Sequence, residues 1–207
     1  MRRMRRLLLG MVAVLAGGWL AAAEPTALPA GFVEGMRRAL DADGAWTMEK
    51  TVPALKRPLK SSGLVSCFRG KGFIWVTERP FRHEIRITPE AMTFASVGNR
   101  SERKAADLPY YEEICALTDR FAAGERGALA DFFDEVEGSA LEGGRWRVRL
   151  VPVRQARRLF AEVELTGGET LDSAVLRAPD GTVISLVFRE LGRATHRLWQ
   201  EQADGTP

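Results

Sequence analysis

The chain has 207 residues, with 30 Lys and Arg against 27 Asp and Glu, and a formal net charge of +3. Four of the basic residues lie in the first 23 positions, so the rest of the chain carries 26 basic and 27 acidic residues. Nucleic-acid binding depends on concentrated positive charge, and this near-neutral balance argues against a nucleic-acid partner.

The first 23 residues have the pattern of a secretory signal peptide. Four arginines precede a fourteen-residue apolar run at 7–20, and three alanines at 21–23 provide a small-residue cleavage site. The run is shorter than the ~20 residues that a membrane-spanning helix needs. We therefore expect a cleavable signal peptide at 1–23, export from the cytoplasm, and a single soluble domain over 24–207 without a lipid-attachment cysteine at its start.

Export would place Cys67 and Cys115 in an oxidising compartment, where a disulfide is permitted. Such a bond would close a loop of nearly fifty residues, worth about 4 kcal/mol on the chain-entropy model. The sequence does not show whether the two residues come within ~7 Å of each other. A disulfide and two buried thiols therefore both remain open.

The first half of the domain predicts one helix followed by strands. Residues 30–43 carry apolar side chains at helical spacing and end at Gly44. Short alternating runs bounded by Pro, Gly, Asn or Ser then predict strands. These runs are 46–55, 64–69, 73–78, 81–88 and 91–97.

The stretch from 70 to 88 contains two of these runs around a break at Glu78-Arg79-Pro80. Alternation places Phe73, Trp75, Thr77 and Arg79 on one face of the first strand. A guanidinium beside apolar surface must find acceptors, because an unpaired buried charge costs several kcal/mol. The alternative is a surface arginine on an edge strand.

The middle of the chain changes to helical spacing. One helix is predicted from Asp107 to Gly124 and a second over 129–136. Their apolar stripes most often serve core packing. The stripe residues are Tyr110, Ile114, Leu117 and Phe121 in the first helix, and Leu129, Phe132, Phe133 and Val136 in the second.

From 145 onward the alternation of strands returns. Arginines at 145, 147 and 149 and glutamates at 162 and 164 alternate with apolar residues, which is typical of an antiparallel sheet with one solvated face. Opposite charges could pair across that face, but exposed pairs contribute under ~1 kcal/mol. A hairpin is predicted from 171–178 and 183–191 around the Pro179-Asp180-Gly181 turn.

Motifs of the common catalytic sites are absent from the sequence. It contains no Gly-rich phosphate loop, no G-x-S-x-G, no H-E-x-x-H and no paired C-x-x-C. Of the two histidines, His83 alternates with Ile85 and Ile87, which favours a hydrogen-bonded core histidine over a ligand or a base. We expect no enzymatic activity, no metal site and no cofactor.

Three short motifs resemble the LolA family of periplasmic carriers, which move lipoproteins to the outer membrane. The order of elements is similar as well, from signal peptide through helix and strands to two helices and a second set of strands. The motifs are Gly72-Phe73-Ile74-Trp75-Val76 with Arg79-Pro80, Trp146-Arg147-Val148-Arg149-Leu150-Val151-Pro152, and Asp180-Gly181-Thr182-Val183.

The resemblance implies an α+β fold in which a strongly curved antiparallel sheet, an incomplete β-barrel, has a helical lid over an apolar cavity. It implies that Arg79 hydrogen-bonds the lid backbone and holds the cavity closed until cargo enters. The residues that would contact cargo are Arg79, Phe73, Trp75, Phe81, Ile114, Leu117, Phe121 and Phe132.

The implied function is a monomeric periplasmic carrier, a chaperone of outer-membrane biogenesis. It would take acylated lipoprotein or another lipid from an inner-membrane donor complex to an outer-membrane acceptor. Phe81 follows the Arg-Pro pair without the family's usual spacer, and the chain ends soon after Trp199, so we expect a shorter LolA-related branch. The alternative is a periplasmic sensor or protein-interaction module that uses the same curved sheet.

Overall fold

The computed structural model describes residues 28–107, 115, 118–120, 123, 125–153, 156–158, 160–193 and 195–203. The predicted signal peptide at 1–23 and most of the helix predicted over 107–124 lie outside these residues. No helix in the described part of the chain is long and apolar enough to cross a membrane.

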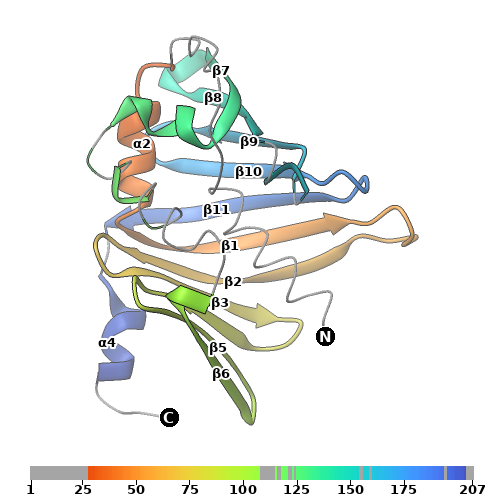
Figure 1. Cartoon of the computed structure of the whole chain (residues 1–207), viewed down its shortest axis with the longest axis vertical. Helices are drawn as coiled ribbons and strands as arrows, with labels where there is room; N and C mark the ends of the chain where they lie inside the picture. Colours follow the sequence, from red (N-terminus) through yellow and green to blue (C-terminus); the bar gives the residue numbers. More distant parts are fainter. Residues whose placement is uncertain are drawn as a thin grey trace.

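Eleven strands form one antiparallel sheet, with the order β6-β5-β4-β3-β2-β1-β11-β10-β9-β8-β7 from edge to edge (Figure 1). β1 pairs with β11 in the middle of the sheet, so the first and last strands join two meanders. The strands are β1 (Ala42–Thr51), β2 (Leu59–Phe68), β3 (Gly72–Arg79), β4 (His83–Ile87), β5 (Ala91–Ser96), β6 (Asn99–Lys104), β7 (Phe133–Ala140), β8 (Trp146–Pro152), β9 (Glu162–Gly167), β10 (Leu171–Arg177) and β11 (Val183–Arg193).

The prediction of one antiparallel sheet that does not close into a barrel is confirmed, because β6 and β7 form its two edges. Helical structure is sparse among the described residues. A helical lid and an apolar cavity stay predictions, since the segment that would form the lid lies largely outside the described residues. The helical elements are α2 (Phe32–Ala39), α4 (Arg197–Ala203) and the 3-10 turns η1 (Ala105–Asp107), η2 (Arg126–Asp131), η3 (Glu142–Gly144) and η4 (Ala156–Arg158).

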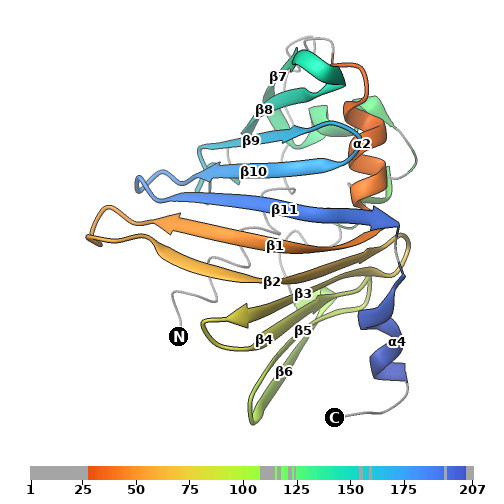
Figure 2. The same cartoon turned by 180° about the vertical axis from the view of Figure 1, so that it is seen from behind.

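The main core lies on the face of the sheet that α2 covers, which we call the inner face. α2 packs over β10 and β11, as Figures 1 and 2 show from opposite sides. Phe32 and Trp146 meet edge to face at 4.9 Å, and the Trp146 Nε1–H donates to the Gly168 carbonyl at 2.8 Å. A Cβ on Gly35 would approach Gly168 and Trp146 to 3.0–3.1 Å, so this glycine allows the close approach of helix and sheet.

The helix predicted over 129–136 is wrong. Leu129 lies in η2, whereas Phe133 and Val136 lie in β7, and all three side chains are buried. A bulge at Asp134 shifts the register against β8, so Phe133 faces Pro152 and Val136 faces Leu150. One extra residue in a strand of period two produces a spacing of three, which is the spacing of a helix.

β6 is a strand that the sequence pattern did not predict. All of its residues are polar and five of six are exposed, with the partly buried Ser101 as the exception. The strand forms through its backbone pairing with β5, from Ser96 and Asn99 to Ala91 and Lys104. A charged edge strand has no apolar alternation to read and also resists edge-to-edge aggregation.

The last helix, α4, packs against β2 on the opposite, outer face of the sheet. The Asp43 carboxylate accepts hydrogen bonds from the backbone N–H groups of Thr195 (2.7 Å) and His196 (2.8 Å), just before α4 begins. The Thr195 hydroxyl adds a bond of 2.7 Å, and the Ser66 hydroxyl bonds the other carboxylate oxygen. The His196 ring then stacks on Phe68 with centroids 3.6 Å apart.

Candidate functional site

An aromatic cluster occupies the inner face where the two meanders meet. The Trp46 and Trp75 rings stack with centroids 4.4 Å apart and planes at 24°. Phe188 meets Trp75 edge to face at 6.3 Å. The three residues come from β1, β3 and β11, and alternation along each strand directs them to the same side.

Gly63 on β2 lies between Trp46 and Thr77 in the register of the sheet. A Cβ at this position would lie 1.9 Å from the Val76 carbonyl oxygen, so no side chain fits there. The polar atom of Trp46 is satisfied, because its Nε1–H donates to the Leu64 carbonyl at 3.0 Å. The stacked rings therefore present apolar surface to the inner face.

Beside this cluster lie two buried polar side chains, Thr77 and His83. His83 Nδ1 is 3.1 Å from the Phe81 carbonyl oxygen, which requires a proton on Nδ1. His83 Nε2 forms the second hydrogen bond, with the Thr77 hydroxyl at 3.0 Å. Both ring nitrogens are thus engaged, and the prediction of a hydrogen-bonded core histidine is confirmed.

Several apolar side chains around the cluster are only partly buried. They pack against the core on the inner face, yet part of each surface stays accessible in the described structure. An apolar ligand on this face would contact these residues first. They are Met48, Phe73, Met92, Phe94, Leu165 and Phe188.

The predicted cargo-contact residues fall into three groups. Phe73 and Trp75 lie on the inner face, and Phe132 is buried in the same core next to η2. Phe81 is 78 % exposed at the loop between β3 and β4. Ile114, Leu117 and Phe121 lie outside the described residues.

Arg79 does not share a face with Phe73 and Trp75, so that expectation is wrong. A bulge at Glu78 lets Thr77 pair with Gly63 but brings Arg79 opposite Ser62. Ser62 pairs with Thr47, which alternates with the inner-face residue Trp46. The extra residue therefore turns Arg79 to the outer face, where its side chain is exposed.

On the outer face Arg79 borders an open recess of about 910 Å³. Arg79 has no side-chain hydrogen bond or ion pair with any described residue, whereas Lys60 pairs with Glu49 at 3.4 Å. Hydroxyl groups form most of the remaining polar surface. The lining residues are Thr47, Met48, Glu49, Thr51, Lys60, Ser61, Ser62, Arg79, Pro80, Ser185 and Val187.

Sequence reasoning missed Trp46 and Phe188, which complete the aromatic cluster. Both lie in segments that alternation predicted as strands. The missing information was the pairing of β1 with β11, which places residues 46 and 188 opposite each other. No local pattern reports contacts between segments so far apart.

The described residues offer little reactive chemistry. They contain no group of three or more His, Cys, Asp or Glu side chains that could hold a metal ion. Cys67 and Cys115 are not joined in a disulfide. Burial, with a smaller effect of Asp43 and Asp41, raises the pKa of Cys67 to about 12, so the nucleophilic thiolate is scarce at neutral pH.

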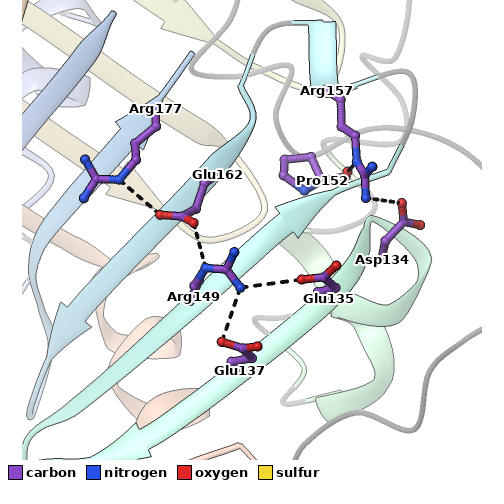
Figure 3. Close-up of polar contacts among 8 residues, drawn as sticks. All are labelled: Asp134, Glu135, Glu137, Arg149, Pro152, Arg157, Glu162 and Arg177. Atoms are coloured by element: carbon purple, nitrogen blue, oxygen red, sulfur yellow. Dashed lines mark hydrogen bonds and ion pairs between the residues drawn. The ribbon is translucent and has the colours of Figure 1, made fainter. Parts of the chain in front are cut away.

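Charged residues of the outer face pair across β7 to β10, as the alternation predicted (Figure 3). Arg149 donates to Glu162 at 2.7 Å and lies 3.3 Å from Glu137 and 3.5 Å from Glu135. Arg177 donates to the other oxygen of Glu162 at 3.1 Å. These groups satisfy one another, and the surface that they form is a solvated face.

No protein-family model and no curated protein sequence matches the chain. Solved structures that are similar to this chain include proteins from several bacteria. A LolA superfamily protein from Nitrosomonas europaea is 9 % identical with a TM-score of 0.38, and the match covers 83 % of this chain and 97 % of that one. A chain of the Pseudomonas aeruginosa MucA/MucB complex is 12 % identical with a TM-score of 0.42, and the match covers 76 % of this chain and 54 % of that one.

An outer membrane lipoprotein-sorting protein domain from Vibrio parahaemolyticus is 9 % identical with a TM-score of 0.35, over 80 % of this chain and 94 % of that one. The LolA superfamily, which the sequence motifs resemble, is thus represented among the similar structures.

Proposed function

We propose that this protein is a periplasmic carrier that holds the acyl chains of a lipoprotein, or of a related lipid, against the inner face of its sheet. The observation that carries the proposal is the apolar character of that face. In the order of the sheet, side chains from β5 at one side to β7 at the other form one apolar cluster there, and Met48, Phe73, Phe94 and Phe188 remain partly accessible.

The acyl chains of a lipid need an apolar surface to cover them in an aqueous compartment. Each CH₂ group of an acyl chain costs about 0.8 kcal/mol in water, so a lipid with two long chains does not cross an aqueous space unaided. A carrier must cover those chains and must also release them. An open sheet with a separate covering segment suits both steps, because cargo can shift the balance between covered and uncovered states.

In this proposal the segment from 108 to 124 covers the inner face, and Ile114, Leu117 and Phe121 contact cargo together with Phe73, Trp75 and Phe132. The signal peptide directs the chain to the periplasm. The chain works as a monomer between an inner-membrane donor and an outer-membrane acceptor. Arg79 and Phe81 act at the rim of the sheet, not on the inner face.

A pair of neighbouring residues on β11 provides the test. Phe188 belongs to the inner-face cluster, whereas Val187 is exposed on the outer face. We expect Phe188→Ser to weaken binding of a fluorescent fatty-acid probe about tenfold or more, at ~0.8 kcal/mol for each lost CH₂ contact. Val187→Ser should leave the binding unchanged.

Circular dichroism must show that both variants are folded. Native mass spectrometry of the purified mature protein should also detect retained lipid. If the wild-type protein binds neither lipid nor probe, the carrier proposal fails, and a protein-interaction module becomes the better explanation.

A further inference from the structure

Exposed large hydrophobic side chains gather at one end of the sheet. Leu55, Leu59, Phe81 and Val97 lie in or next to three hairpin loops, those joining β1 to β2, β3 to β4 and β5 to β6. Phe81 and Val97 are 78 % and 92 % exposed. A fifth exposed residue, Val187, lines the recess beside Arg79.

The antiparallel pairing places all three loops at the same end. Ser62 near the start of β2 faces Arg79 at the end of β3, and His83 at the start of β4 faces Ser96 at the end of β5. Figures 1 and 2 show the loops following one another along one rim, away from α2 and α4. At the opposite end, the described turns at 69–71 and 88–90 carry no exposed large hydrophobic residue. We call the residues 52–60, 79–82 and 97–100 the loop rim.

Cationic side chains are interleaved with these hydrophobic residues. Lys56 and Arg57 follow Leu55, and Arg79 and Arg82 flank Pro80 and Phe81. All four are exposed, as is Arg100 beside the β5–β6 turn. The segments 52–58 and 79–82 contain no acidic residue, and the nearest acid along the sequence, Glu78, precedes Arg79. The loop rim is therefore positive, although the chain after residue 23 is close to neutral.

We propose that the loop rim docks on the surface of an anionic lipid bilayer. Phe81, Leu55 and Val97 would enter the interfacial region, and the arginines and lysines would contact lipid phosphates. Basic side chains near an anionic leaflet each strengthen binding about fivefold, and interfacial apolar groups add to this. The recess beside Arg79 adjoins these loops and presents hydroxyl groups to the headgroups, with Lys60 paired to Glu49 at its edge.

The form of the rim favours a bilayer over a protein partner. Its hydrophobic residues stand on three separate loop tips, with charges between them. A specific protein interface instead has a contiguous, well-packed apolar centre from which charged residues are depleted. A bilayer deforms around separate tips and supplies phosphates to each cation.

The test is co-sedimentation of the mature protein with vesicles of phosphatidylglycerol and phosphatidylethanolamine in equal parts, and with vesicles of phosphatidylcholine alone. We expect binding to the first kind, little binding to the second, and release as salt rises from about 0.1 M to about 0.5 M. Arg57→Ser/Arg82→Ser should weaken binding about twenty-five-fold. Phe81→Ser/Val97→Ser should weaken it about tenfold or more.

The matched control removes two cations at the other end of the sheet. Arg103 and Lys104 are exposed on β6 and face Met92 and Ala91, away from the loop rim. Arg103→Ser/Lys104→Ser should bind anionic vesicles as the wild type does. Equal losses in this control and in the rim variants, or no preference of the wild type for anionic vesicles, would overturn the proposal. So would self-association of the wild type that disappears in Phe81→Ser/Val97→Ser.

Docking of the loop rim on a bilayer is a separate property from the proposed carrier function, and the two can fail separately. Binding of the fatty-acid probe is measured without vesicles and depends on Phe188, whereas vesicle binding depends on the rim. A protein that binds the probe but not anionic vesicles refutes docking and keeps the carrier. The reverse result refutes the carrier and keeps docking.

Discussion

Trp46 and Trp75 lie face to face across the Gly63 position of the intervening strand, with ring centroids 4.4 Å apart. Both side chains are almost fully buried. The contact links the first strand of the chain to the strand that leads into the Arg79-Pro80 corner. It is the centre of the inner-face cluster.

Trp75→Ala should destabilise the protein by about 3–5 kcal/mol, because the substitution removes the buried ring and leaves a cavity against Trp46. Chemical denaturation monitored by circular dichroism measures this change. Phe81→Ala is the control, since Phe81 is 78 % exposed and its loss should change stability by less than about 0.5 kcal/mol. A Trp75→Ala variant as stable as the Phe81→Ala variant would contradict the stacked core.

Gly63→Ala should cost more than about 3 kcal/mol or prevent folding. The new Cβ would lie 1.9 Å from the Val76 carbonyl oxygen, and a backbone clash inside a sheet is relieved only by moving a strand. Gly127→Ala is the matched control, because a Cβ at that position has no neighbour within 4 Å. Thermal unfolding of both variants distinguishes a tight strand contact from a general intolerance of glycine substitution.

Asp43 should make the stability of the protein depend on acid pH. Burial opposes the charged carboxylate, but hydrogen bonds from Ser66, Thr195 and His196 outweigh it and hold the pKa of Asp43 below its ordinary value. A carboxyl group with a lowered pKa in the folded state stabilises the fold above its unfolded pKa of about 4, and this contribution is lost as pH falls further.

We expect Asp43→Asn to cost about 2 kcal/mol at pH 7, because charged acceptors are lost at the start of α4. The cost should shrink as pH falls below about 4. Urea denaturation across this pH range measures it. Asp172→Asn is the comparison, since its pair with Arg145 at 3.0 Å is exposed. The same pH profile in both variants would count against a particular role of Asp43.

Arg149 is the centre of the charged network on the outer face (Figure 3). Its hydrogen bond to Glu162 lowers the pKa of that carboxyl, and Arg177 adds to the effect. Since the side chains are partly exposed, Arg149→Met should cost only about 0.5–1 kcal/mol, and most of that should vanish at high salt. Arg147→Met should cost less, because Arg147 lies 3.9 Å from Glu164 and makes no shorter ion pair with a described residue.

Local side-chain periodicity determined much of the fold from the sequence alone. The alternation of residues such as Trp146, Val148 and Leu150 with arginines assigned strands and separated an apolar from a charged face. The Pro179-Asp180-Gly181 turn located the last hairpin, where Asp180 bonds the Thr182 N–H at 2.9 Å. These features are readable because strand faces and turns depend on neighbours within a few residues.

Three features were decided only by the tertiary structure. The bulge at Glu78 moved Arg79 to the outer face, and the bulge at Asp134 gave a strand the spacing of a helix. The pairing of β1 with β11 brought Trp46 and Phe188 together. A bulge and a long-range pairing are set by the partner strand's register, and one segment's sequence does not contain its partner's register.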